Sequence, residues 1–144
     1  MAITKDWLLW AALSAVFAAF TAIFTKVGVR GVNSHLAVLI HTFVIFLMLL
    51  AANGLLGTWG QFAKLRASTV GWLMASGLAT GASWMCYFRA LQLGDASKVG
   101  PIDKSSVVLV ALLAFVFLQE RPTWREWLGI ILVSGGVLLL SIRK

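Results

Sequence analysis

Long apolar stretches separated by short polar connections dominate the chain. Each stretch has roughly the 20 mostly apolar residues that a helix needs to cross the hydrocarbon core of a bilayer. The predicted spans are residues 7–27, 36–56, 70–93, 99–118 and 124–142. Because an open sheet leaves backbone groups unsatisfied in lipid, the pattern predicts an all-α membrane protein, a bundle of five transmembrane helices.

The connections between these stretches are too short to hold a soluble domain, so we expect a single transmembrane domain over residues 1–144. The first stretch contains a charge-free run over residues 7–25. This run is longer than the roughly 7–15 residues of a signal peptide's apolar region. We therefore expect it to be retained as the first helix.

Composition agrees with a membrane protein, since 60% of the residues are hydrophobic and only 12% are charged. The net charge is +7, but the basic residues stand singly at the span ends. Such flanking residues anchor helices in the bilayer, whereas nucleic-acid binding needs a basic patch or stripe. We expect the lipid bilayer as a partner, no nucleic acid, and a multi-pass location in the inner (plasma) membrane.

Signatures of catalysis are missing from the sequence. It contains neither a G-x-S-x-G nucleophile elbow nor an H-E-x-x-H zinc helix. Its single cysteine, Cys86, lies in an apolar stretch and provides no intrachain disulfide and no Cys-based metal site. The sequence therefore predicts a protein that is not an enzyme and that has no cofactor and no metal.

The basic residues are balanced between the two sides of the membrane that the spans define. Side A holds the N-terminus and the connections near residues 57–69 and 119–123, and side B is the opposite side. Side A carries Lys5, Lys64, Arg66, Arg121 and Arg125, and side B carries Lys26, Arg30, Lys98, Arg143 and Lys144, with Arg89 and Lys104 lying deeper. Because an excess of Lys and Arg normally sets orientation, this balance predicts dual topology and an antiparallel homodimer.

Tryptophan is distributed on one side only. Six of the seven tryptophans lie at side A ends: Trp7, Trp10, Trp59, Trp72, Trp124 and Trp127. Tryptophan favours the headgroup level on both faces of a membrane. An inverted second copy would give each leaflet such a belt, which also favours an antiparallel pair.

Ionisable residues inside the spans are the candidates for a substrate or ion pathway. Arg89 and Asp103 lie seven residues before and after a predicted turn near Ala96. Each is therefore roughly 10 Å from that turn, at one level of a helical hairpin. Lys104, Lys26 and His41 approach the same half from side B. Such groups are costly in lipid and usually face a cavity or a partner.

Other interpretations of these residues are open. Lys26 and Lys104 can extend toward the headgroups, Arg89 and Asp103 can form a structural ion pair, and His41 can be an interior histidine. Pro101 is expected to kink the fourth helix or to begin it. Gly77 and Gly81 form a G-x-x-x-G step, which predicts helix packing either within one protomer or at a dimer seam.

Nearly the whole chain resembles a known family, most specifically in its second half. The residues that carry the resemblance are the segment 90–101, the run 107–118, Gln119-Glu120-Arg121-Pro122-Thr123-Trp124, and the glycine-rich segment 127–137. They are similar to the EamA domain of the drug/metabolite transporter superfamily. The resemblance implies a single five-span half of a fold that commonly has two halves in opposite orientation. It does not imply a substrate, and the first-span glutamate of the related small multidrug exporters has no counterpart over residues 7–27.

The function predicted from these observations is a secondary transporter subunit. It moves a small polar solute, anionic or zwitterionic, by alternating access as an antiparallel homodimer. Arg89, Lys104 and Lys26 attract the solute, Asp103 is the charge partner or proton site, and His41 is polar lining. The alternative is a non-transporting accessory or scaffold subunit, or half of a heterodimeric transporter.

Overall fold

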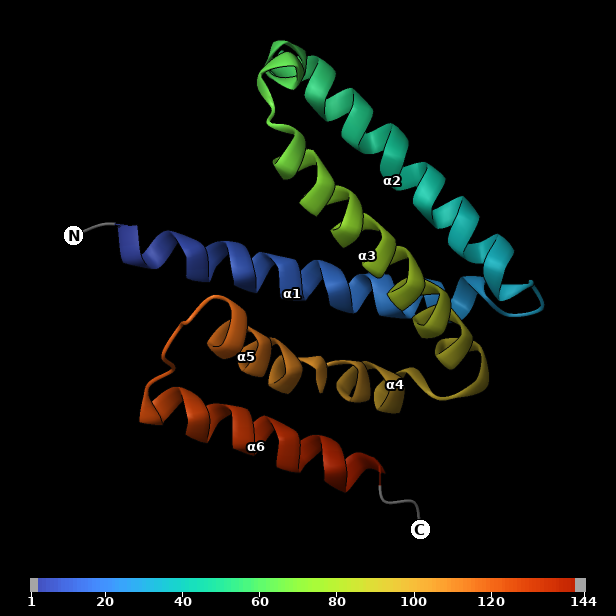
Figure 1. The fold of residues 1–144 in the computed structure, drawn as a ribbon. Helices are drawn as coiled ribbons and strands as arrows, with labels where there is room; N and C mark the ends of the chain where they lie inside the picture. The colour runs from blue at the N-terminus through green and yellow to red at the C-terminus, as the bar shows by residue number, and fades with distance from the viewer. Residues whose placement is uncertain (1–2, 142–144) are drawn as a thin grey trace. The chain divides into compact units, whose positions relative to one another are not determined.

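The computed structural model describes residues 3–141, except for the side chains of residues 3–5, 62–63 and 141. Their regular secondary structure is helical, with no β-strand among the described residues, which confirms the predicted all-α class for them. The elements are α1 (Ile3–Gly28), α2 (Ser34–Leu56), the short 3₁₀ helix η1 (Thr58–Lys64), α3 (Ala67–Leu93), α4 (Ala96–Asp103), α5 (Ser106–Phe117) and α6 (Trp124–Ser141) (Figure 1). The predicted end of the last span at residue 142, and the side B residues Arg143 and Lys144, lie outside the described residues.

The chain forms two compact units, Met1–Leu93 and Gly94–Lys144, which we call the N-terminal and the C-terminal unit. In the N-terminal unit α2 and α3 run side by side in opposite directions, connected through η1, and α1 packs against α3 (Figure 1). In the C-terminal unit α6 packs against both α4 and α5.

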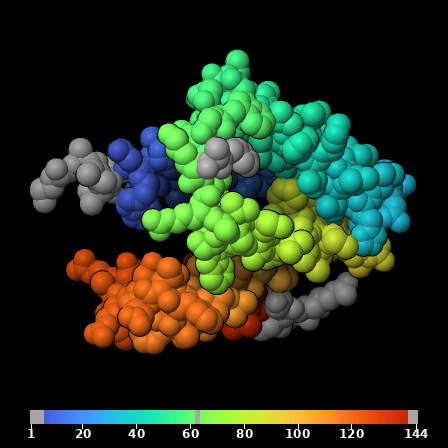
Figure 2. Space-filling model, turned by 45° about the horizontal axis from the view of Figure 1, so that its top comes forward, coloured from blue at the N-terminus to red at the C-terminus, as the bar shows by residue number. Residues whose placement is uncertain are grey.

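Most large apolar side chains of the described residues lie on the surface. The buried apolar residues are only Val29, Phe88, Leu91 and Val137 among the side chains that the structure describes. The side chains of α2 form a continuous outer surface of the N-terminal unit (Figure 2), and they include exposed residues such as Leu39, Phe43 and Met48. Exposed apolar area of this extent is unfavourable in water, so it has to be covered by lipid or protein.

Three helical segments are long and apolar enough to cross a membrane: Asp6–Gly28, Ser34–Leu56 and Ala96–Phe117. Helices form over most of each of the five predicted spans, but α3 and α6 do not meet this criterion in the described residues. Glycine, serine and threonine lower the apolar character of α3, and α6 is short, with 18 residues. The five-span bundle is therefore confirmed only in part.

Local side-chain chemistry explains where α2 begins and ends. The Asn33 side chain accepts a hydrogen bond from the His35 N–H at 2.9 Å, which satisfies one of the free donors of the first turn. At the other end Gly57 has φ +65°, and its N–H donates to the Asn53 carbonyl. Glycine tolerates this left-handed conformation because it has no Cβ.

The predicted fourth span, residues 99–118, is divided into two helices. Pro101 lies inside α4 and does not begin that helix, and the helical pattern is interrupted at residues 104–105. Just after the interruption the Val107 N–H donates to the carbonyl of Lys104, three residues earlier, at 3.1 Å. Proline removes one N–H and its ring clashes with the turn before it, so Pro101 disfavours a regular helix in this region, but the break itself lies after the proline, where the tighter bonds form. Asp103 is therefore the last residue of α4, next to an interruption of the segment Ala96–Phe117.

Candidate functional site

The most tightly packed part of the N-terminal unit is where the end of α1 and the α1–α2 connection meet the end of α3. Leu91 and Val29 have 0% and 1% of their surface exposed, and Phe88 is also buried. The polar side chains of Thr25 and Ser34 are buried in the same unit. This small core determines how the three helices are oriented relative to one another at this end.

Lys26 links α1 to the end of α3. Its Nζ donates a hydrogen bond to the carbonyl of Leu91 at 2.7 Å. The last four carbonyls of a helix have no partner within the helix, and a cation close to them is favourable because that end of the helix dipole is negative. The structure therefore gives Lys26 a tethering contact at α3, while its predicted role in the pathway stays a prediction.

Arg89 is held by a relay through Gln92. The Nη1 of Arg89 donates to the Oε1 of Gln92 at 2.6 Å, and the Nε2 of Gln92 donates to the carbonyl of Val32 at 2.7 Å. Val32 belongs to the α1–α2 connection, so the guanidinium is anchored to a segment about 60 residues away in sequence. Gln92 is not among the residues predicted from the sequence, although an amide side chain one turn after a deep arginine indicates a hydrogen-bond partner for it.

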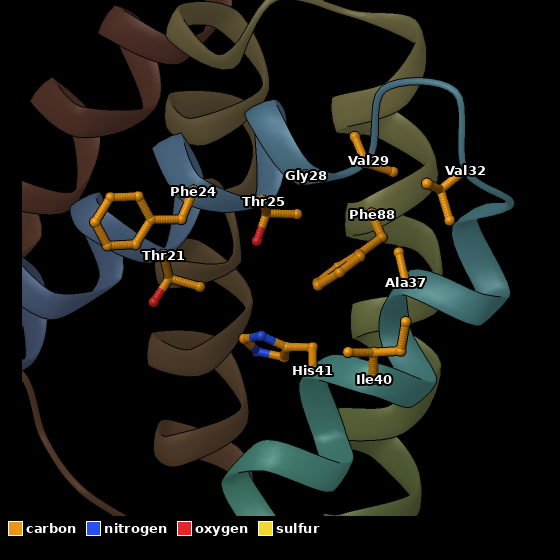
Figure 3. Close-up of a pocket in the computed structure, with 10 residues that line it drawn as sticks. All are labelled: Thr21, Phe24, Thr25, Gly28, Val29, Val32, Ala37, Ile40, His41 and Phe88. Carbon is orange, nitrogen blue, oxygen red and sulfur yellow. The ribbon is translucent and has the colours of Figure 1, made fainter.

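A cavity of about 340 Å³ lies between α1, α2 and α3 (Figure 3). Its walls are mostly apolar, with three polar side chains among them: Thr21, Thr25 and His41. The other lining residues are Phe24, Gly28, Val29, Val32, Ala37, Ile40 and Phe88. A mostly apolar hollow of a few hundred cubic ångströms with a few convergent polar groups is typical of a small-molecule site.

His41 is positioned in this cavity by two aromatic residues of α3. Its ring centroid lies 4.8 Å from that of Trp84, in an edge-on arrangement, and 5.2 Å from that of Phe88. In Figure 3 the side chains of His41, Phe88 and Thr25 extend into the same space. Because an imidazole can both donate and accept hydrogen bonds, His41 can orient a polar group of a molecule bound there.

The remaining candidates belong to the C-terminal unit. The Nζ of Lys104 lies 3.4 Å from the Oδ2 of Asp103, and both side chains are partly exposed. Lys26, His41 and Arg89 lie in the N-terminal unit, whereas Pro101, Asp103 and Lys104 lie in the C-terminal unit. The structure brings the first set to one end of its unit and the second set to the helix interruption. The predicted convergence of the two sets stays a prediction.

The glycine step of α3 is open within its own unit. A Cβ added to Gly77 or Gly81 would meet no atom within 4 Å among the described residues. No helix of the N-terminal unit therefore approaches α3 closely at this step. Packing of this surface against a second protomer stays a prediction.

Comparison with known proteins adds the family context. The profile of the EamA-like transporter family matches residues 5–142. An uncharacterized transporter in the cobO 3' region of Sinorhizobium is 47% identical over 139 residues, which cover 96% of this chain and 99% of that protein. A probable 4-amino-4-deoxy-L-arabinose-phosphoundecaprenol flippase subunit, ArnE, of Yersinia pestis is 30% identical over 110 residues, 76% of this chain and 96% of that protein. No solved structure matches the chain.

Proposed function

Since the chain belongs to the EamA-like transporter family, we propose that it is a transporter subunit that moves a small anionic or zwitterionic solute across the inner membrane. Two copies in opposite orientations form the working unit. The pair of copies opens the solute pathway first to one side of the membrane and then to the other. Lys26, Arg89 and Lys104 attract the solute, His41 lines its path, and Asp103 is the proton or charge-coupling site.

The cavity among α1, α2 and α3 is the observation that carries this proposal. It places a histidine and two threonines in a hollow of a unit whose surface is otherwise strongly apolar. A polar group inside a membrane is costly unless it faces a cavity or a partner, so its presence there argues for a solute path. The tethers at Lys26 and Gln92 support a preformed shape for the end of this path.

The relatives support the substrate class and the need for a second chain. The name of the Yersinia relative contains an amino sugar joined through a phosphate to the lipid undecaprenol, and the sugar and phosphate together carry charges of both signs. The same name calls that relative a subunit. A heterodimeric transporter half, or an accessory subunit, is therefore the second candidate for this chain.

Uptake by the purified protein alone tests the proposal. Proteoliposomes containing only this chain should accumulate at least one solute from a panel of labelled amino acids, organic anions and sugar phosphates, compared with protein-free liposomes. Two copies of one chain suffice for transport if the homodimer is correct. Lack of uptake across the panel would reject the self-sufficient transporter in favour of the second candidate.

Reporter fusions test the antiparallel assembly. A C-terminal tag that is active only inside the cell and another that is active only outside should both give signal, because the basic residues are balanced. Replacing Lys64 and Arg66 with alanine removes two side A charges and should shift the ratio toward molecules with side A outside. A single active reporter in the unmodified protein would exclude dual topology.

A further inference from the structure

A second concavity of the N-terminal unit is chemically different from the cavity at His41. It has a volume of about 550 Å³ and is lined by Asn33, Ser34, His35, Met85, Cys86 and Arg89. One wall is the beginning of α2, and the other is the last third of α3. Arg89 is four residues from the end of α3, about 6 Å along the helix axis, so the concavity lies near the ends of the helices.

The charge around this concavity is strongly positive within its own unit. Residues 1–93 contain a single carboxylate, Asp6, and it is about 30 Å along α1 from Lys26. Lys26, Arg30 and Arg89 all belong to the end of the unit where the concavity lies. The hydrogen-bond partner of Arg89 in this unit is a neutral amide, Gln92. The guanidinium charge is therefore not compensated within the unit.

Side chains with N–H donors line this concavity from two different helices. The Gln92 relay holds one edge of the Arg89 guanidinium, and this group has five N–H donors in all. His35 contributes at least one further N–H from a different helix. Arginine matches phosphate and carboxylate groups alike, but a phosphate group has three strong acceptor oxygens, one more than a carboxylate, for donors that come from two helices.

We propose that the concavity formed by Arg89 and His35 is a binding site for a phosphate group. This proposal extends the proposed function by naming phosphate as the anionic group that the site recognises. The role of the site in transport rests on the proposed function. The same chemistry belongs to the headgroup of a phospholipid and to a soluble phosphate. Binding itself does not require transport.

Cys86 provides a direct probe, because it lines this concavity, is exposed, and is the only cysteine of the chain. Its rate of alkylation by N-ethylmaleimide is measured on the purified protein in maltoside micelles without phosphate. One arm titrates inorganic phosphate, with sodium chloride and sodium acetate at the same ionic strength as controls. The other arm adds phosphatidylglycerol, with diacylglycerol of the same acyl chains as its control.

Phosphate should slow alkylation about tenfold at ten times the concentration that halves the rate, since only the empty site reacts. The substitutions Arg89→Gln and His35→Asn should each raise the phosphate concentration that halves the alkylation rate, because charge-assisted hydrogen bonds to phosphate are lost. For Arg89→Gln this concentration should rise by about tenfold or more. Arg66→Gln is the matched control. It removes a basic residue just before the beginning of α3, at the end of that helix opposite to Arg89, and it does not line the concavity, so protection by phosphate should persist.

Each outcome decides a point. Protection by inorganic phosphate assigns the site to a soluble phosphate, and protection by phosphatidylglycerol alone assigns it to a lipid headgroup. Absence of protection in both arms, equal protection by acetate, or full protection in Arg89→Gln overturns the proposal. Alkylation needs no substrate movement, so failure here with intact uptake rejects the phosphate site alone, and failed uptake with intact protection rejects only the transport role.

Discussion

Replacing Asp103 with asparagine should reduce uptake in proteoliposomes by at least about tenfold, which corresponds to roughly 1.4 kcal/mol in the activation barrier. Asp103 ends α4 at the interruption of a predicted membrane span, and its carboxylate faces Lys104 at 3.4 Å. Asparagine keeps the size of the side chain but removes its charge and its ability to carry a proton. A coupling role therefore predicts loss of flux with the folded protein still in the membrane.

Asp95→Asn is the matched control for this substitution. Asp95 also belongs to the C-terminal unit and pairs with a lysine, Lys98, but its side chain is 72% exposed and precedes α4. Exposed ion pairs of this kind contribute little, so uptake should be close to that of the unmodified protein. Unchanged uptake in Asp103→Asn would remove Asp103 from the mechanism. Equal losses in both variants would indicate a general charge effect.

Leu91→Ala should destabilise the N-terminal unit by about 2–5 kcal/mol, the range for removing a fully buried leucine side chain. Leu91 has no exposed surface, and its carbonyl accepts the hydrogen bond from Lys26. The alanine leaves a cavity in the small core that joins α1, the α1–α2 connection and α3. Thermal unfolding in detergent, followed by circular dichroism, measures the loss.

Leu93→Ala serves as the comparison on the same helix. Leu93 is 72% exposed, so its truncation removes little packing within the chain and should change stability by less than about 0.5 kcal/mol. Equal effects of the two substitutions would show that the contact around Leu91 does not hold the unit together. A large effect of Leu91→Ala alone would confirm the core that the structure places there.

For the interruption of the fourth span, the local sequence predicts the region of the chain but not the position of the break. Pro101 marks the region, because its missing N–H and its ring disfavour a continuous helix there. The position of the break, at residues 104–105 and after Asp103, depends on how the backbone rearranges into tighter bonds such as that from Val107 to Lys104. The beginning of α4 at Ala96 instead of residue 99 also differs from the prediction.

The hydrogen bonds that connect α3 to α1 and to the α1–α2 connection could not be predicted from the local sequence. Lys26 and Leu91 are 65 residues apart, and Gln92 and Val32 are 60 residues apart. Nothing in the local pattern around Lys26 distinguishes a residue that reaches the headgroups from one that binds a helix carbonyl. The same holds for His35, which lies at an ordinary helix start in the sequence but lines a concavity with Arg89 in the structure.

The sequence by itself determined the membrane class, the all-helical fold and the approximate helical segments, because the length and apolarity of a segment decide whether it is stable as a helix in lipid. It also indicated the family through its second half. Only the tertiary structure decided which polar groups share a cavity, which residues anchor Arg89 and Lys26, and where the small core lies. These features depend on contacts between helices distant in sequence, and such contacts arise from packing geometry that no single helical pattern contains.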